Sequence, residues 1–203
     1  MPNLLTKPTT GVGPIIFDLE TNGLLNDATK IHCVALHWCE DDQTEAFNDE
    51  PYGDGTFDIK EDAPMAGNYA IHTGLQWLET ADVLVGHNII GFDIPIIKRL
   101  YHWFTPSGTI VDTLLLSRLY HPNLLDIDKK YGWKHMPLQL YGRHSLEAWG
   151  YRLGVYKGNF AKTTDWKNWS QEMQDYCEQD VIVTTKLCRH FHKYLNGYHL
   201  NIR

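Results

Sequence analysis

The chain contains 203 residues, of which 43% are hydrophobic, and it carries a formal net charge of −7. This length accommodates one domain with a substantial core, and the composition is that of a globular protein. Because no run of about 18 apolar residues occurs and the first residues hold no apolar stretch typical of a secretory signal, we expect a cytoplasmic protein without a membrane partner.

The first part of the chain has the pattern of a sheet. Residues 14–20 form an apolar run that predicts a buried strand, and the alternation over residues 30–39 predicts its hairpin partner. Residues 43–47 predict a third strand. The segment 48–68 is rich in Gly, Pro and acidic residues and lacks periodicity, so we expect a loop or insertion there.

The remainder alternates short apolar runs with amphipathic ones. We predict helices over residues 72–80, 92–103, 112–120, 145–153 and 169–195, and strands over residues 82–86 and 109–111. Strands followed by alternating strands and helices indicate an α/β fold with a mixed sheet flanked by helices. We assign the domain to residues 14–195, with an N-terminal extension over 1–13 and a C-terminal tail over 196–203.

Charge is distributed unevenly along the chain. Residues 40–62 contain ten acidic residues and one basic residue, whereas residues 129–167 contain eight basic and two acidic residues. Aromatic residues are interleaved with the basic ones, as suits single-stranded nucleic acid, although an ordinary solvated surface has the same composition. The four cysteines form no CxxC pair, and we expect reduced thiols of a cytosolic compartment.

Several acidic residues lie in stretches that contain no Lys or Arg. Asp18 and Glu20 are two apart on the first predicted strand, so they project from the same face. Asp93 lies where a predicted strand gives way to a helix, and stabilisation of the helix N-terminus is the alternative explanation. Asp112 also opens a helix, and we interpret it as an N-cap. Crowded carboxylates repel one another, so a divalent cation among them would be stabilising.

Tyr176 and Asp180 are four residues apart on the last predicted helix and share one face. The same face carries Met173, Val183 and Leu187, which form the stripe expected to turn toward the core. An acidic side chain on such a stripe is typical of metal binding or catalysis rather than of a solvated surface.

The order of these motifs, DLE at 18–20, N-x4-D at 88–93 and YxxxD at 176–180, resembles the tyrosine-bearing branch of the DEDD 3′–5′ exonucleases, which are DnaQ-like, RNase H-like proteins. The segments VDTLLLSRLYHPNL, HSLEAWGYRLGVYKG and MQDYCEQDVIVT are similar to the proofreading domain of family A DNA polymerases from short-tailed bacteriophages. The resemblance covers most of residues 14–195. The chain stops where the polymerase thumb, palm and fingers would begin, so we expect no polymerase activity.

The resemblance implies two Mg²⁺ or Mn²⁺ ions that act on a phosphodiester. In the family pattern Asp18 bridges both ions, Glu20 and Asp180 complete the shell of the first, and Asp93 holds the second. Tyr176 orients the attacking water. Oxygen-rich ligands favour such hard cations over zinc.

The resemblance further implies that Thr21, Leu24 and Asn88 contact the terminal nucleotide, with Leu24 wedged beside the base. The alternative is that these are turn residues, with Leu24 in the core. A zinc site at His190 and His192 is disfavoured because the two side chains point apart on a helix.

These features together predict a metal-dependent 3′–5′ exonuclease that releases nucleoside 5′-monophosphates from single-stranded DNA. The candidate partner is a separately encoded DNA polymerase for which the chain proofreads, in the host cytoplasm if the chain is phage-encoded. Two alternatives stay open: an RNase D-like exoribonuclease with the same catalytic residues, and a non-catalytic module that binds a polymerase or single-stranded DNA. Contacts near the 2′-hydroxyl decide the choice of sugar, and the sequence does not reveal them.

Overall fold

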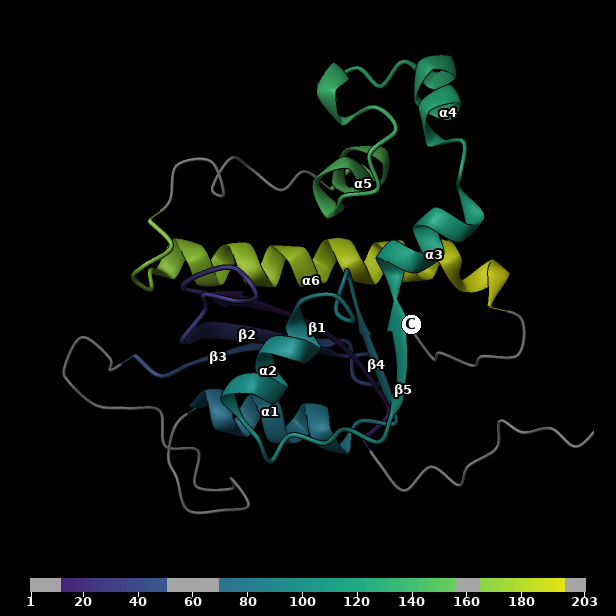
Figure 1. The fold of residues 1–203 in the computed structure, drawn as a ribbon. Coiled ribbons are helices and arrows are strands. Elements are labelled where there is room, and N and C mark those ends of the chain that lie inside the picture. Colours follow the sequence, from purple (N-terminus) through teal and green to yellow (C-terminus); the bar gives the residue numbers. More distant parts are fainter. Residues whose placement is uncertain (1–11, 51–69, 156–164, 196–203) are drawn as a thin grey trace, which may run out of the picture.

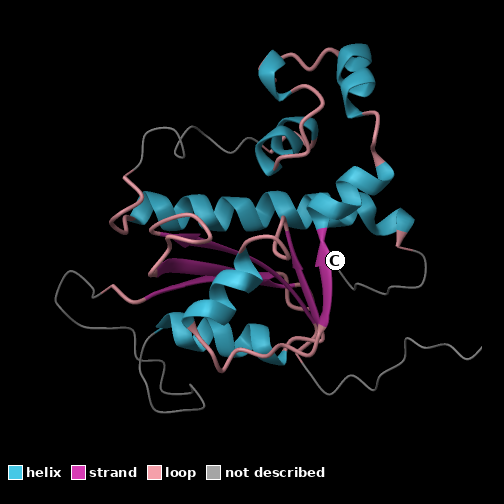
Figure 2. Cartoon of the chain, in the orientation of Figure 1, coloured by secondary structure: helices cyan, strands magenta, loops and turns pink. Residues whose placement is uncertain are grey.

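The structure is a computed structural model that describes residues 12–50, 70–155 and 165–195. The predicted 48–68 loop and the two predicted terminal segments lie largely outside these ranges. At the centre is a sheet of five strands in the order β3-β2-β1-β4-β5 (Figures 1 and 2). The strands are β1 (Pro14–Thr21), β2 (Ile31–Trp38), β3 (Gln43–Asn48), β4 (Val83–Gly86) and β5 (Thr109–Asp112).

The sheet is mixed, as predicted. β1 pairs antiparallel with β2 and parallel with β4, β2 pairs antiparallel with β3, and β5 extends the parallel part. Side chains alternate along β1, so Phe17 and Leu19 join the core cluster on one face and Ile16 joins the cluster on the other. Asp18 and Glu20 have the same parity as Ile16, which fixes the face on which they project.

Helices cover both faces of the sheet (Figure 1). The helices are α1 (Ala70–Thr80), α2 (Asp93–Leu100), α3 (Thr113–Tyr120), α4 (Leu124–Tyr131), α5 (Leu146–Arg152) and α6 (Gln171–Phe191), with short 3-10 turns η1 (Leu138–Leu140) and η3 (His192–Tyr194). α1 packs against β2 and β3, and α6 packs across β1 and β2 on the opposite face. Residues 124–155 form an α4–α5 lobe on the far side of α6 from the sheet.

Two predicted helices end earlier than the sequence indicated. α2 stops at Leu100 rather than at residue 103, because Tyr101 leaves the helical region with φ −125° and ψ 83°. Tyr101 and Phe104 instead pack edge-on against Trp103. The last predicted helix, over residues 169–195, corresponds to α6, which begins after Ser170 and ends at Phe191. The Ser170 side chain accepts a hydrogen bond from the Met173 N–H, and the chain continues after α6 as the 3-10 turn η3.

α4 was not predicted. Its sequence, LLDIDKKY, is only eight residues long and half of these residues are charged, so the segment is shorter than the window over which a helical period can be recognised. The structure bounds it with Asn123 at the N-cap and with Gly132, which adopts the left-handed conformation with φ 58° that favours glycine at a helix end. These two residues were the available signals.

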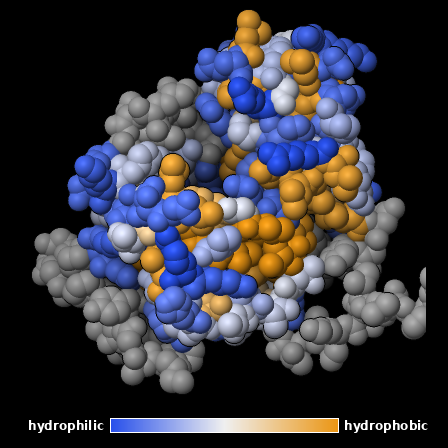
Figure 3. Space-filling view, in the orientation of Figure 1, coloured by the Kyte–Doolittle hydropathy of each residue, from blue (hydrophilic) through white to orange (hydrophobic). Residues whose placement is uncertain are grey.

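The four cysteines are free and buried, in agreement with the expectation of reduced thiols. Exposed apolar side chains gather over β5 and α3 (Figure 3), where Ile110, Leu115 and Leu119 lie. Among the described residues, no helix combines the length and hydropathy needed to cross a membrane.

Candidate active site

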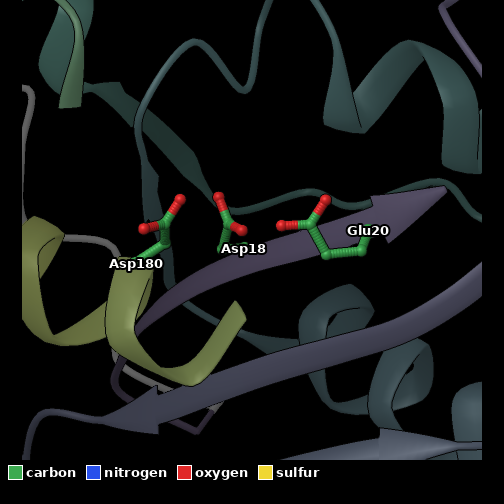
Figure 4. Close-up of side chains that lie close together, drawn as sticks. All are labelled: Asp18, Glu20 and Asp180. Atoms are coloured by element: carbon green, nitrogen blue, oxygen red, sulfur yellow. The ribbon is translucent and has the colours of Figure 1, made fainter. Parts of the chain in front are cut away.

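Three carboxylates meet where β1 passes α6. Asp18, Glu20 and Asp180 each offer a carboxylate oxygen, and these oxygens all lie within 4.8 Å of one another. Figure 4 shows the three side chains in a row, two from β1 and one from α6. Asp18 and Glu20 are partly exposed, whereas Asp180 is only 6% exposed. The structure thus brings together three of the acids singled out from the sequence, and their role as metal ligands remains a prediction.

The packing of α6 on the sheet sets the position of Asp180. Met173 and Cys177 occupy the same face of α6, are fully buried, and pack with Ile16 of β1. The Cys177 thiol donates a hydrogen bond to the Asp18 carbonyl oxygen at 3.4 Å. Burial raises the pKa of Cys177 well above its ordinary value, and contact with Cys33 adds to the effect. The thiol of Cys177 is therefore neutral where it lies beneath the acidic cluster.

Asp93 approaches the cluster from the first turn of α2 but is not one of the three acids within 4.8 Å. It is 4% exposed. Its pKa is raised to about 7, first by burial and then by the negative charges of Asp112 and Asp180, which outweigh the hydrogen bonds from the backbone N–H groups of Asp93 and Leu19. The Leu19 N–H comes from β1, between Asp18 and Glu20, so Asp93 is tied to the strand that carries the other two acids.

Asp112 has a larger role than the predicted N-cap. It does cap α3, accepting hydrogen bonds from the N–H groups of Leu114 and Leu115. Its two carboxylate oxygens also accept from the N–H of Asn88 at 3.0 Å and of Ile90 at 3.1 Å. Asp112 therefore holds the turn that leads from β4 into α2. Parallel pairing of Gly86 with Asp112 at the ends of β4 and β5 brings the two segments together.

Close packing fixes the same turn from the other side. A Cβ atom on Gly86 would lie 2.9 Å from the carbonyl oxygen of Phe17 and would overlap the side chain of Ile89. The hydroxyl of Thr113 donates to the Gly86 carbonyl at 3.0 Å and contacts His87 Nδ1 at 2.9 Å. The backbone that precedes Asp93 is consequently held by β1, β5 and α3 together.

The predicted nucleotide contacts lie on two turns near the carboxylates. Thr21 is buried and donates to the Gly23 carbonyl at 2.7 Å. Leu24 is 75% exposed, which rules out the alternative that it belongs to the core. Asn88 is exposed and adopts a left-handed conformation with φ 68°. Contact of these residues with substrate remains a prediction.

Two further candidates from the sequence have definite places. Tyr176 is partly exposed and lies one turn before Asp180 on α6; its role toward water remains a prediction. His190 faces His121, with 2.8 Å between the two Nε2 atoms, while His192 is exposed in η3. The structure agrees with the inference that His190 and His192 do not form a pair.

The donor set at the cluster fits a hard divalent cation. All three groups are carboxylates, and oxygen ligands suit Mg²⁺ or Mn²⁺ better than zinc. Three like charges at this separation repel, and a cation between them would offset that repulsion.

The family follows from comparison with known proteins. The family model described as RNase_H superfamily matches residues 15–192, which is most of the chain. The chain belongs to the RNase H superfamily. The DNA-directed DNA polymerases of Escherichia phage T7 and Enterobacteria phage T3 are each 29% identical to the chain over 197 residues, covering 85% of this chain. The match covers 26% of each polymerase, so the chain spans about a quarter of their length.

Solved structures share the same RNase H-like fold. Brucella melitensis NrnC bound to pGG superimposes with a TM-score of 0.56 at 17% identity, covering 99% of this chain and 80% of NrnC. NrnC with bound Mg²⁺ gives the same TM-score at 18% identity, with 98% and 80% coverage. The EXO domain of Aedes aegypti Nibbler gives 0.54 at 11% identity, with 95% and 83% coverage. At these identities the likeness concerns the fold, which is that of an RNase H-like exonuclease domain.

Proposed function

We propose that the chain is a metal-dependent 3′–5′ exonuclease that hydrolyses the terminal phosphodiester of single-stranded DNA and releases nucleoside 5′-monophosphates. The observation that carries this proposal is the meeting of Asp18, Glu20 and Asp180 carboxylate oxygens within 4.8 Å at the seam between β1 and α6. Asp93, tied to the same strand, supplies a fourth acid close by.

The residues divide the chemistry among them. Asp18, Glu20 and Asp180 would hold one divalent cation, and Asp93 together with Asp18 would hold a second. When bound, such cations neutralise a phosphodiester and make a nucleophile available at neutral pH. Tyr176, one turn before Asp180, would orient the attacking water through its hydroxyl.

The turns beside the cluster would bind the 3′-terminal nucleotide. Leu24 projects from a turn that is braced from both ends: the Asn22 side chain accepts hydrogen bonds from the Thr29 and Lys30 N–H groups, and Arg99 donates to the carbonyls of the same turn. An exposed apolar side chain on a rigid turn suits a wedge beside a base. Asn88, exposed on the opposite turn, would contact the strand.

The identity to two phage DNA polymerases supports a DNA substrate, and a proofreading role for a separately encoded polymerase in the host cytoplasm is consistent with it. An RNase D-like activity would use the same acids. Parallel digestion of 5′-labelled DNA and RNA oligonucleotides of matched sequence, with Mg²⁺ and then with EDTA, distinguishes the two substrates.

The catalytic assignment is tested by Asp18→Ala. Removing this carboxylate should lower the rate of mononucleotide release by about a thousandfold, corresponding to about 4 kcal/mol, because the site loses a ligand central to charge neutralisation. Asp175→Ala is the matched control: Asp175 is an exposed acid on α6, and its loss should leave the rate unchanged. Full turnover by the folded Asp18→Ala variant contradicts the proposal.

A further inference from the structure

The α4–α5 lobe presents a pair of stacked aromatic rings at its surface. Tyr131, the last residue of α4, is 67% exposed. Its ring lies on that of Trp133 with 5.6 Å between the ring centroids and 27° between the planes. Exposing so large an apolar surface is unfavourable unless something covers it.

A buried ion pair holds this aromatic platform, defined here as Tyr131 and Trp133, in place. The Trp133 Nε1–H donates to Asp128 at 2.9 Å. Asp128 is fully buried and receives two hydrogen bonds from Arg152, at 2.9 and 2.7 Å, and one from the Gly142 N–H at 2.8 Å. Burying a carboxylate and a guanidinium carries a desolvation cost. Here the pair orients the indole that supports Tyr131, so the platform is rigid before any ligand binds.

The charge around the platform is positive, in contrast to the whole chain. Residues 124–155 contain five basic and three acidic residues, whereas the chain as a whole carries −7. Two of the eight form the internal Asp128–Arg152 pair. Lys129, Lys130 and Lys134 are exposed next to the platform in sequence, and Figure 3 shows hydrophilic side chains spread over the lobe.

A hollow lies on the same lobe. It has a volume of about 460 Å³ and is lined by His135, Gly150, Tyr151 and Gly154. Tyr151 and Trp133 both pack against the small core of Met136, Leu140 and Ala148. The hollow and the platform therefore flank one hydrophobic cluster, and the hollow is large enough for a nucleobase.

We propose that the α4–α5 lobe binds single-stranded nucleic acid, with a base stacked on Tyr131 and the phosphates beside Lys129, Lys130 and Lys134. Aromatic faces stack with any base, and lysines contact phosphates irrespective of sequence. This surface therefore distinguishes long strands from short ones but does not distinguish their sequences. One consequence of this proposal rests on the proposed function: the lobe holds the nucleotides upstream of the 3′ end that is being hydrolysed.

The position of the lobe makes this consequence measurable. The lobe stands on the far side of α6, whereas the carboxylates lie between α6 and β1 (Figures 1 and 4). We expect a dinucleotide at the carboxylates not to reach across α6 to the platform, whereas an oligonucleotide of about 12 residues, within the range of known single-strand sites, spans more of the surface. Loss of the platform should therefore affect long substrates and spare the dinucleotide.

The first measurement is binding without catalysis. Fluorescence anisotropy of a labelled oligodeoxythymidine of about 12 nucleotides in EDTA should show about five- to hundredfold weaker binding for Tyr131→Leu, because a stacked base is lost. Tyr131→Phe retains the aromatic face and should bind like the native protein. Replacing all three lysines with Ala should reduce the slope of log K against log salt by up to about 2. Lys186→Ala, an exposed lysine on α6, is the matched charge control.

The second measurement separates this inference from the proposed function. With Mg²⁺, Tyr131→Leu should lose turnover on the long oligonucleotide at low concentration while keeping the native rate on a dinucleotide. Equal affinity of Tyr131→Leu and the native protein in EDTA overturns the platform, as does an equal loss on both substrates. If the native protein hydrolyses neither substrate, the proposed function fails, and the anisotropy in EDTA still decides whether the lobe binds nucleic acid.

Discussion

Asp112 illustrates how one buried carboxylate can organise a site that it does not enter. Four backbone N–H groups converge on it, two from its own helix and two from the turn before α2. The first pair is predictable from sequence, since Asp before a helix is a common N-cap. The second pair depends on the parallel pairing of β4 with β5, which no local pattern reveals.

Asp112→Ser separates the N-cap of α3 from the hydrogen bonds to the turn before α2. Serine preserves the N-cap of α3, but its side chain is too short to reach Asn88 and Ile90, so two backbone N–H groups lose their carboxylate acceptor. We expect the free energy of unfolding to fall by about 2–4 kcal/mol in urea titrations. Turnover should fall by about a hundredfold because the turn that carries Asn88 and Asp93 shifts.

A cap variant elsewhere provides the control for Asp112→Ser. Ser145 caps α5 by accepting from the Ala148 N–H. Ser145→Ala should cost about 1 kcal/mol of stability and leave turnover on a dinucleotide unchanged. If Asp112→Ser behaves like Ser145→Ala, Asp112 is a cap and nothing more.

At the residue scale the sequence predicted a group of four acids, and the structure brings three of them, Asp18, Glu20 and Asp180, within 4.8 Å of one another. The parity of Asp18 and Glu20 and the inward stripe of Asp180 follow from the periods of strand and helix, and the structure agrees with both. Whether Asp93 belongs to the same group depends on where α2 begins relative to β1, which is a tertiary property. The sequence also left undecided whether Leu24 is exposed or lies in the core, since its exposure depends on what packs over the turn.

At the element scale, agreement follows the strength of the hydrophobic pattern. β1, β2 and α6 have long apolar stretches or stripes, and their predicted bounds lie within a few residues of those observed. α4 has instead a buried acid, Asp128, at a position where a pattern-based prediction expects an apolar residue. Its stability comes from Arg152, about two dozen residues later, and such a pairing leaves no periodic trace in the sequence.

The Asp128–Arg152 pair predicts how the lobe responds to acid. Burial alone would raise the pKa of Asp128, but hydrogen bonds from Arg152, Gly142 and Trp133 together hold it below its ordinary value. The unfolded chain then binds more protons than the folded one as the pH falls, so the contribution of Asp128 is present above its unfolded pKa of about 4 and is lost below it.

Asp128→Asn is the variant that isolates this contribution. At pH 7 it leaves Arg152 buried without its charged partner, and we expect urea unfolding to show a loss of about 3 kcal/mol. The gap between the native protein and the variant should close as the pH falls below about 4. Asp126→Asn, which removes an exposed acid from the same helix, should show no such gap. A gap for Asp128→Asn that is independent of pH would contradict the assigned charge state.

On the scale of the whole molecule, the site lies at the boundary between two hydrophobic cores, one on each face of the sheet. One core joins the sheet to α1 and α2, and the other joins it to α6. Each supplies acids: α2 contributes Asp93, α6 contributes Asp180, and β1, which belongs to both, contributes the other two. Folding therefore brings like charges together, and the repulsion among them opposes the packing of α2 and α6 around β1.

This opposition predicts that divalent cations stabilise the entire fold. A ligand that binds only the folded chain, present at about 100 times its Kd, raises the free energy of unfolding by about 2.7 kcal/mol. For a chain of this size that raises Tm by about 5–10 °C. Calorimetry in EDTA and then in Mn²⁺ should show that increase for the native protein and for the control Asp175→Asn, but not for Asp18→Ala. Asp93→Asn should raise the Tm measured in EDTA and reduce the increase in Tm that Mn²⁺ produces. It removes a buried charge that faces Asp112 and Asp180 while keeping an acceptor for the Leu19 N–H, so its Tm in EDTA should exceed that of the native protein, and its gain from Mn²⁺ should be smaller. A native Tm that is the same in EDTA and Mn²⁺ would show that the carboxylates meet without a cation between them.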